Sequence, residues 1–465
     1  MTRGLGLRAE IVAVSALLAG EGVLFSRNLD ARATYDEGVY LASLDALRHG
    51  QALGTDVFGS QPPGFYTLLR LVGLAGGSSI TDLRLGFLAV ALVGCLGAYL
   101  AGRLLLGVVA GVAASALVAI TPPFASEAPR VSADVPSVAL ALAALALAVA
   151  ALRRPAPLWL AGATGAAAAG AVSVKLYAVT VVVPLAALAV VRRASRRQVG
   201  VALAGAAVVA AALAAGYAGA LGSIWQQAFS FHTNARDFGG GEPNGHAVAH
   251  FLDFRTPSGW LVAGGAAASL LVRRVWPFWP WVGACVLLLL LQRPLFEHHL
   301  VLLAASVGLA AGLGLGGVVT RLEPRPAVVA AGVIVAALAV GLAQQVHRLD
   351  YARQTEPAEL RWGWEELARC TRPGERVASD QPIVAFRARR SLPGELVDTS
   401  LVRVKTGSLP PRRVLELLRR DRIRAVFVGR SFEDEPALLS ALRARYPTVR
   451  RHGGVAIYAR AGACS

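Results

Sequence analysis

The sequence predicts a mainly α membrane protein: a polytopic transmembrane bundle of about eleven helices followed by a small C-terminal α/β domain. Composition is the first observation behind this prediction. The 465 residues are 55% hydrophobic and 16% charged, with a mean hydropathy of +0.54, whereas a soluble domain carries about 25% charged residues. The second observation is that apolar runs of roughly 20 residues, each long enough to cross a bilayer, recur along the chain. The third is that these runs stop near residue 346, where a more polar segment begins.

The first apolar segment, about 7–26, is expected to be an uncleaved span, because no clear small-residue cleavage site precedes the polar loop after it. That loop, 27–81, contains two stretches with helical spacing, 35–48 and 64–75, which we expect to form amphipathic helices at the membrane surface. The other expected spans are about 83–102, 106–121, 135–152, 157–173, 176–191, 199–221, 258–272, 277–291, 300–319 and 327–346.

The net charge of +17 does not indicate nucleic-acid binding, because the arginines of the membrane part lie in short loops between the expected spans. Loops rich in arginine face the cytoplasm. Alternate loops carry most of them: Arg103, Arg153 with Arg154, Arg192 and Arg193 with Arg196 and Arg197, Arg273 with Arg274, and Arg321 with Arg325. We therefore expect a multi-pass protein with a cytoplasmic N-terminus, and an extracytoplasmic position for the loop 27–81 and the C-terminal tail.

Residues 347–465 are expected to form a soluble domain after the transmembrane domain of residues 1–346. Strand-like segments at 377–379, 395–397, 424–428 and 455–458 alternate with helical stretches near 359–369, 411–421 and 436–445, which is typical of a small α/β domain. Cys370 and Cys464 both lie in this region. If the region is extracytoplasmic, these two cysteines could pair as a disulfide.

The stretch Tyr35-Asp36-Glu37-Gly38-Val39-Tyr40 places two adjacent carboxylates in the first polar loop, and Gln61-Pro62-Pro63-Gly64 follows in the same loop. A carboxylate there could act as general base on an incoming hydroxyl. Cationic side chains or a divalent metal ion could hold a phosphate that gains charge as it leaves. Further ionisable residues are expected at the same membrane face: Glu127, Arg130, Asp134, Lys175, His298 and His299. This mixture suits a reaction between a lipid phosphate and a hydroxyl.

These motifs resemble those of the GT-C glycosyltransferases, and within them the branch of the protein O-mannosyltransferases and the lipid A aminoarabinose transferase. Members have an acidic residue or an Asp-Glu pair after the first span and then a Pro-Pro motif, as in the first loop here. The segment from Glu127 to Asp134, Lys175 after a Gly/Ala-rich span, and the turn 296–299 are also similar to that family. The resemblance covers about residues 1–346, and the tail is similar to those of bacterial members. Gln61 departs from the family, which commonly has a lysine before the Pro-Pro pair.

The resemblance implies an integral glycosyltransferase of the bacterial plasma membrane. It would move a sugar from a polyprenyl-phosphate donor to an acceptor hydroxyl at the outer face, with inversion and with Asp36 as the general base. The resemblance names neither the sugar nor the acceptor, and it implies a divalent metal ion in some relatives but no organic cofactor. The implied site residues are Asp36 and Glu37 for catalysis, Lys175 and Arg130 for the donor phosphate, Asp134, Glu127 and His298 for the metal ion, and Gln61 and His299 for acceptor or loop contacts.

Each of these residues also has a structural explanation. Acidic residues such as Asp36 and Glu37 favour the first turn of a helix, and Asp134 could cap the span that it begins. Lys175 could extend its charged end to the membrane interface. Further structural roles are an exposed ion pair of Glu127 with Arg130, a plain turn at Gln61, and an interfacial position without chemistry for His298 and His299.

Two other classes of function fit a polytopic chain. One is a transporter or flippase of a lipid-linked saccharide, and the other is a scaffold whose tail binds a partner in the cell envelope. Transporters carry broken helices near the bilayer midplane and inverted repeats. The expected spans have few interruptions and the polar groups gather at one face, which favours the transferase.

Overall fold

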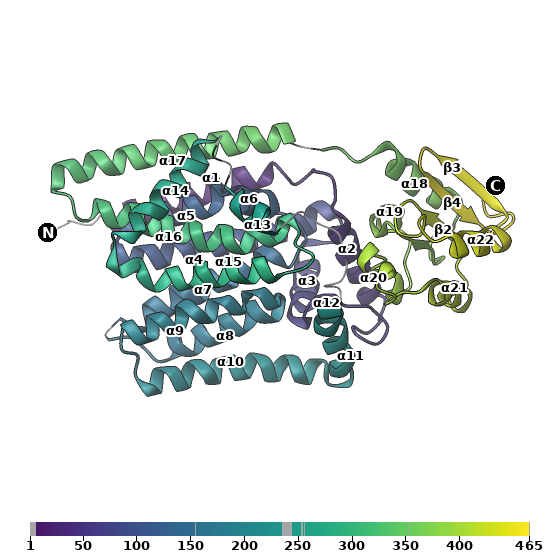
Figure 1. Cartoon of the computed structure of the whole chain (residues 1–465), viewed down its shortest axis with the longest axis horizontal. Helices are drawn as coiled ribbons and strands as arrows, with labels where there is room; N and C mark the ends of the chain where they lie inside the picture. Colours follow the sequence, from purple (N-terminus) through teal and green to yellow (C-terminus); the bar gives the residue numbers. More distant parts are fainter. Residues whose placement is uncertain are drawn as a thin grey trace. The chain divides into compact units, whose positions relative to one another are not determined.

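The computed structural model describes residues 6–153, 155–234, 244–252, 254, 256–352 and 354–464. The chain forms two compact units that do not follow the order of the sequence (Figure 1). The first unit contains residues 1–30, 74–215 and 241–353, and the second contains 31–73, 216–240 and 354–465. The first polar loop therefore belongs to the same unit as the C-terminal tail, whereas the domain boundary expected from the sequence falls after residue 346.

The first unit is a bundle of apolar helices, as predicted. Among the described residues, seven segments are long and apolar enough to cross a membrane. They are α1 (Leu7–Ser26), α4 (Ile80–Leu106), α7 (Asp134–Ala151), α10 (Arg196–Gly216), η5 with α15 (Arg273–Phe278 and Trp279–Leu291), η6 with α16 (Glu297–Leu300 and Val301–Val319), and α17 (Pro324–Ala352). Shorter apolar helices occupy the other expected spans: α5 (Val108–Ile120), α8 (Trp159–Val174), η1 with α9 (Leu176–Val181 and Val182–Val191), and α14 (Pro257–Leu270). Two short helices, α6 (Pro122–Glu127) and α13 (Asn244–Ala249), lie in the connecting segments.

Small residues allow the helices of this bundle to approach closely. Helix α16 packs against both α5 and α14 and is almost wholly buried. A side chain at Gly94 of α4 would meet Cα of Ala139 in α7 at 2.8 Å, and one at Gly312 of α16 would overlap the backbone of Ala114 in α5. Helix α10 has no fully buried residue, but it also approaches α8 closely, because a side chain at Gly205 would overlap the backbone of Gly162.

Two glutamates of α1 are bonded inside the bundle. Glu10 accepts hydrogen bonds from Tyr99 Oη at 2.8 Å and from Arg103 Nε at 2.6 Å, both in α4. Glu21 is buried and accepts from Ser115 Oγ of α5 at 2.7 Å. Because an unpaired carboxylate is costly within a membrane, these bonds tie α1 to its neighbours.

The second unit joins the first polar loop to the tail. Its helices are α2 (Tyr35–Arg48), most of α3 (Pro63–Gly76), η2 (Ala218–Ala220), α11 (Leu221–Trp225), the π turn η3 (Gln226–Ser230), α12 (Phe231–Asn234), α18 (Ala358–Arg369), α19 (Pro382–Arg387), η7 (Gly394–Leu396), α20 (Leu401–Lys405), α21 (Pro411–Arg420) and α22 (Pro436–Arg445). Most residues of α2 are buried. A Cβ at Gly38 of α2 would lie 2.8 Å from the backbone nitrogen of Ile383 in α19. The helices predicted at 35–48 and 64–75 are confirmed, but protein covers most of α2.

A four-stranded sheet of order β1-β2-β4-β3 lies in the tail. Strand β1 (Ala378–Ser379) pairs in parallel with β2 (Ala425–Val428), and β4 (Val455–Ala459) pairs antiparallel with both β2 and β3 (Thr448–His452). The turn between β3 and β4 uses Gly453 at φ 56°, a conformation that favours glycine. The strand expected at 395–397 is wrong, because these residues enter the 3-10 turn η7 after Pro393. The prediction also missed β3, an exposed and arginine-containing edge strand.

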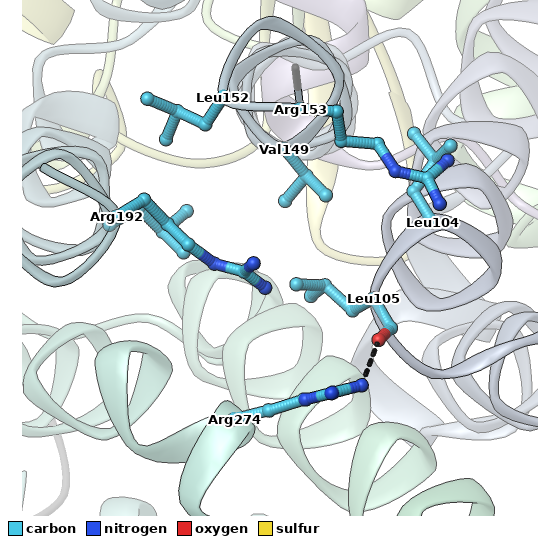
Figure 2. Close-up of a pocket in the computed structure, with 8 residues that line it drawn as sticks. Leu104, Leu105, Val149, Leu152, Arg153, Arg192 and Arg274 are labelled. Atoms are coloured by element: carbon cyan, nitrogen blue, oxygen red, sulfur yellow. Dashed lines mark hydrogen bonds between the residues drawn. The ribbon is translucent and has the colours of Figure 1, made fainter. Parts of the chain in front are cut away.

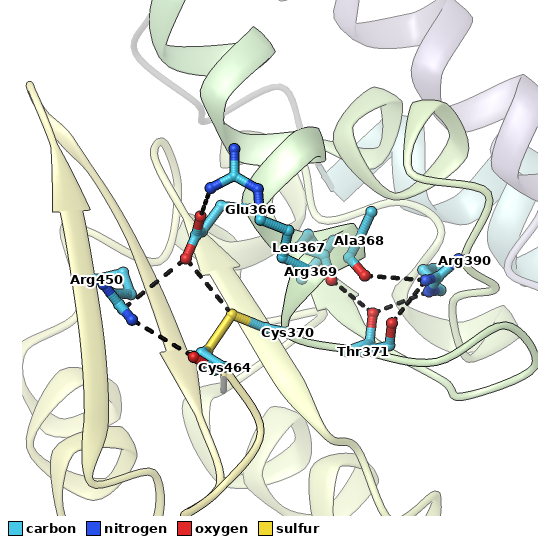
Figure 3. Close-up of a disulfide and its surroundings, with 9 residues drawn as sticks. All are labelled: Glu366, Leu367, Ala368, Arg369, Cys370, Thr371, Arg390, Arg450 and Cys464. Atoms are coloured by element: carbon cyan, nitrogen blue, oxygen red, sulfur yellow. Dashed lines mark hydrogen bonds and ion pairs between the residues drawn. A yellow bond between two sulfur atoms is a disulfide. The ribbon is translucent and has the colours of Figure 1, made fainter.

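Cys370 and Cys464 form a disulfide across 94 residues, from the end of α18 to the chain after β4 (Figure 3). The carboxylate of Glu366 lies beside the bond, accepts from Arg369 Nη1 at 2.6 Å and lies 3.9 Å from Arg450 Nε. The pairing considered from the sequence is therefore present. Disulfides are typical of oxidising compartments outside the cytoplasm.

Candidate functional site

Asp36 and Glu37 lie in the first turn of α2, in different surroundings. Thr34 Oγ1 accepts from the backbone nitrogen of Glu37 at 3.2 Å, and the Glu37 carboxylate accepts from the backbone nitrogen of Thr34 at 3.2 Å. This reciprocal arrangement is a capping box, and Glu37 is fully buried in it. Asp36 is outside the capping box and partly exposed. Of the two carboxylates, Asp36 is therefore the more accessible to a substrate.

Side chains of the tail hold this turn within the second unit. The backbone nitrogen of Thr399 donates to Tyr35 Oη at 2.9 Å, and the Arg430 guanidinium lies 4.2 Å from the centre of the Tyr35 ring. Burial raises the pKa of the Tyr35 phenol well above its usual value, so the hydroxyl stays neutral. These partners could not be recognised from local sequence patterns, because Tyr35 and Thr399 are 364 positions apart.

The loop between α2 and α3 is anchored by local and distant hydrogen bonds. Gln61 Nε2 donates to Tyr40 Oη at 3.1 Å, so this side chain is directed toward α2. The amide nitrogen of Gly59 donates to Gln227 Oε1 of η3 at 2.8 Å. The Pro-Pro pair then starts a helix, with Pro63 as the first residue of α3. These contacts fix the loop that carries the predicted Pro-Pro motif.

A buried ion pair lies in the first unit. Asp134 is the first residue of α7, and Lys175 is in extended backbone between α8 and η1. Lys175 Nζ donates to Asp134 Oδ1 at 2.6 Å, and each side chain is about 7% exposed. The lysine ammonium also lies 5.3 Å from the centre of the Tyr177 ring. The break between α8 and η1 therefore places a cation in a largely enclosed site.

Two histidines of η6 adjoin this pair. The His299 ring meets the Tyr177 ring edge to face at 5.2 Å and the His298 ring at 4.4 Å. Atoms of Asp134, His298 and His299 capable of binding a metal lie within 4.8 Å of one another. A carboxylate with two imidazoles is a donor set found in catalytic zinc sites, which leave a coordination position open. These three residues fit a divalent ion, provided that Asp134 is shared with or released by Lys175.

Glu127 and Arg130 form their own ion pair at 3.3 Å, with each side chain about one-sixth exposed. Asp134, Glu127 and His298 were the predicted metal ligands, but the group in the structure contains His299 in place of Glu127. Four of the predicted residues of the first unit, Asp134, Lys175, His298 and His299, therefore come together. Asp36, Glu37 and Gln61 belong to the second unit. Tyr177, which contacts both Lys175 and His299, was missed because an aromatic residue two positions after a lysine is a weak signal.

Comparisons with known proteins give the fold a precedent. The crystal structure of ArnT from Cupriavidus metallidurans bound to undecaprenyl phosphate is similar over 99% of both chains, with a TM-score of 0.70 and 15% sequence identity. The chain has an ArnT-like GT-C fold. Archaeal oligosaccharyltransferase AglB from Archaeoglobus fulgidus, in complex with an inhibitory peptide and a dolichol-phosphate, shares this GT-C fold over 97% of this chain and 74% of its own, with a TM-score of 0.54 and 12% identity. The Archaeoglobus fulgidus oligosaccharyltransferase complex with Zn and sulfate gives a TM-score of 0.54 at 14% identity, over 88% of this chain and 67% of its own.

The sequence itself matches one family model, that of the dolichyl-phosphate-mannose-protein mannosyltransferases, over residues 60–217. This range is about a third of the chain and includes Gln61, Glu127, Arg130, Asp134 and Lys175. A search of curated sequences finds no match. The resemblance to GT-C glycosyltransferases is thus confirmed at the level of the fold.

Proposed function

We propose that this protein is a membrane glycosyltransferase that transfers a sugar from a polyprenyl-phosphate donor to an acceptor hydroxyl, with inversion. The observation that carries the proposal is the fold match over 99% of both chains to ArnT, a structure bound to undecaprenyl phosphate. The family model over residues 60–217 and the AglB complex with dolichol-phosphate support the same class of donor. The buried ammonium of Lys175, held by Asp134, is a cation of the kind that can stabilise a lipid phosphate.

Asp36 is the proposed general base. Its carboxylate takes the proton of the acceptor hydroxyl as that oxygen attacks the anomeric carbon, and the bond from this carbon to the phosphate oxygen breaks. Attack from the face opposite the leaving phosphate inverts the anomeric centre. Glu37 is less suited to this role because it is fully buried and its carboxylate closes the capping box with Thr34.

Lys175 is the proposed partner of the donor phosphate. The leaving polyprenyl phosphate changes from a diester to a monoester and gains a negative charge, which a nearby cation stabilises. Asp134 holds Lys175 in place at 2.6 Å, and Arg130 is a second cationic candidate. A divalent ion bound by Asp134, His298 and His299 would supply further positive charge. The Archaeoglobus fulgidus oligosaccharyltransferase complex with Zn is a precedent for a metal ion in this fold.

We place the transfer at the extracytoplasmic face of a bacterial plasma membrane. The arginine pairs at one set of helix ends obey the positive-inside rule with a cytoplasmic N-terminus. The Cys370–Cys464 disulfide supports an oxidising compartment for the unit that also contains Asp36.

Comparison of Asp36→Asn with Glu37→Gln tests the base. Glutamine retains the capping-box function, so the second variant removes a neighbouring charge while it keeps the fold of the turn. Membranes with each variant are supplied with a series of labelled polyprenyl-phosphate sugars. We expect Asp36→Asn to lose at least about a hundredfold in transfer rate, and Glu37→Gln to lose far less, at equal protein levels.

The reverse pattern would assign the base to Glu37. Equal activity in wild type and both variants would show that neither carboxylate in the first turn of α2 takes part in the reaction. If wild type transfers none of the sugars but moves a lipid-linked saccharide across proteoliposomes, the flippase alternative replaces the transferase.

A further inference from the structure

A pocket lined by arginines lies in the first unit, at the opposite end of α7 from Asp134. It encloses about 180 Å³ between the last turns of α4, α7 and α9 and the start of η5 (Figure 2). Helix α7 begins at Asp134 and reaches this pocket with Val149. At about 1.5 Å per residue the two places are more than 20 Å apart along α7. The pocket is therefore separate from the proposed transfer site. Its lining residues are Leu104, Leu105, Val149, Leu152, Arg153, Leu188, Arg192 and Arg274.

Three arginines from three different loops supply the charge of this pocket. Figure 2 shows Arg153, Arg192 and Arg274 around it, and Arg274 Nη1 donates to the backbone oxygen of Leu105 at 3.4 Å. Arg153 and Arg192 form no side-chain hydrogen bond or ion pair with other residues that the structure describes, and all three arginines are exposed. No acidic residue is among the lining residues in the described part of the chain. Three guanidinium groups without a carboxylate favour an anion with several oxygens, such as a phosphate.

The rest of the lining is apolar. Leu105, Val149 and Leu188 are each at most 5% exposed, and Leu104 and Leu152 complete the wall. A free inorganic anion gains nothing from such a wall, whereas an amphiphile places its phosphate on the arginines and its glycerol and acyl carbons on the leucines. The pocket also lies at the ends of membrane-crossing helices, where basic pockets bind anionic lipid headgroups.

We propose that this pocket binds the phosphate headgroup of an anionic phospholipid from the leaflet that the arginine-rich loops face. The arginines fix the headgroup, and the apolar wall receives the first carbons of the lipid. Binding here joins the ends of α4, α7, α9 and η5 through one ligand. The proposal does not depend on glycosyl transfer, because it uses none of the residues of that site.

The chain offers a matched control for the test. Arg192 and Arg274 line the pocket, while their neighbours Arg193 and Arg273 are exposed in the same loops and are not among its lining residues. The variants Arg192→Gln/Arg274→Gln and Arg193→Gln/Arg273→Gln therefore have equal net charge, and only the first removes arginines that line the pocket. Native mass spectrometry of the full-length protein in detergent, titrated with phosphatidylglycerol or phosphatidylcholine, measures the bound lipid.

We expect the wild type and the Arg193/Arg273 variant to retain phosphatidylglycerol in preference to phosphatidylcholine. The pocket variant should bind phosphatidylglycerol at least about tenfold more weakly, since each basic residue at a lipid surface contributes about fivefold and this variant lacks two. Arg153→Gln should weaken binding in the same direction. It is exposed and its side chain has no described hydrogen bond, so it provides a pocket variant that does not perturb the packing.

Three results would overturn the proposal. Equal losses in the two double variants would mean that general surface charge attracts the lipid. If phosphatidylcholine were retained as well as phosphatidylglycerol, the pocket would bind lipid through its apolar wall alone and would not recognise the charge of the headgroup. Displacement of phosphatidylglycerol by millimolar inorganic phosphate would indicate a site for a free anion rather than a lipid.

Discussion

At the scale of single residues, the Asp134–Lys175 pair combines stability with the proposed chemistry. Both side chains are withdrawn from solvent, so each charge depends on the other. Breaking such a pair by removing one partner typically costs 3–5 kcal/mol, whereas replacing both partners can be nearly neutral. The two roles can therefore be separated by experiment.

Lys175→Met should lower both the melting temperature and the rate of transfer. The loss of stability follows from the buried carboxylate of Asp134, and the loss of rate follows from the missing cation at the phosphate. The double variant Asp134→Asn/Lys175→Met should recover most of the melting temperature while transfer stays at least about a hundredfold below wild type. Thermal unfolding in detergent and a labelled-donor assay measure the two effects.

Lys175→Arg is the control for this prediction, because it keeps a cation although with different geometry. It should retain more activity than Lys175→Met. Recovery of transfer in the double variant would show that Lys175 acts on stability alone.

Asp380 gives the tail a dependence on pH. It is fully buried and accepts hydrogen bonds from the backbone nitrogens of Gly429, Arg430 and Phe432, but burial outweighs these bonds and raises its pKa to about 6. The folded state therefore binds this proton more tightly than the unfolded state, in which the pKa is about 4. Its contribution to stability is complete below about pH 4 and is lost as the pH rises through about 6.

Between pH 4.5 and 7, the melting temperature of the wild type should therefore fall relative to that of Asp380→Asn, by a few degrees. Asparagine keeps one oxygen for the backbone donors but cannot titrate. Thermal unfolding of the two purified proteins across this range gives the difference. Parallel curves would mean that Asp380 holds the same charge in the folded and unfolded states.

At the scale of elements, local signals were readable from the sequence and distant ones were not. Helix α2 has the predicted bounds, because its periodicity and its acidic first turn are encoded within fourteen residues. The buried surface of α2 was not predictable, since α19 lies more than 300 positions later in the chain. The turn η7 was mistaken for a strand because three residues carry too little pattern to separate the two.

Close packing of α16 against α5 makes a prediction for the membrane part. A leucine at Gly312 would overlap the backbone of Ala114, whereas Gly332 of α17 has no atom within 4 Å of where its Cβ would be. Gly312→Leu should therefore lower the free energy of unfolding by about 1–3 kcal/mol, the usual cost of overpacking. Gly332→Leu should have little effect. Fluorescence-detected gel filtration after heating compares them. Equal melting temperatures would show that the α5–α16 contact is not a tight one.

At the scale of the whole molecule, the sequence identified most residues of the buried group but not their grouping. Asp134, Lys175 and the histidines could be named because ionisable residues are rare near membrane spans. The sequence could not show which carboxylate lies beside the histidines, because that depends on how the helices pack. In the structure it is Asp134, whereas Glu127 pairs with Arg130. The compact units were equally hidden, because the first loop joins a tail that begins more than 280 residues after it.

The orientation of the protein in the membrane determines which leaflet each proposed site faces. Arg153, Arg192 and Arg274 line the proposed lipid pocket, and the disulfide lies in the unit that contains Asp36. The positive-inside rule and the redox compartment therefore predict the same topology from independent chemistry. Alkaline phosphatase, which is active only outside the cytoplasm, should be active when fused after Ser465 and inactive when fused after Arg193; a green fluorescent protein fusion should show the opposite pattern. Active phosphatase after Arg193 would show that the topology is the opposite of the one predicted. The proposed lipid pocket would then face the outer leaflet, and the proposed base would act on a cytoplasmic acceptor.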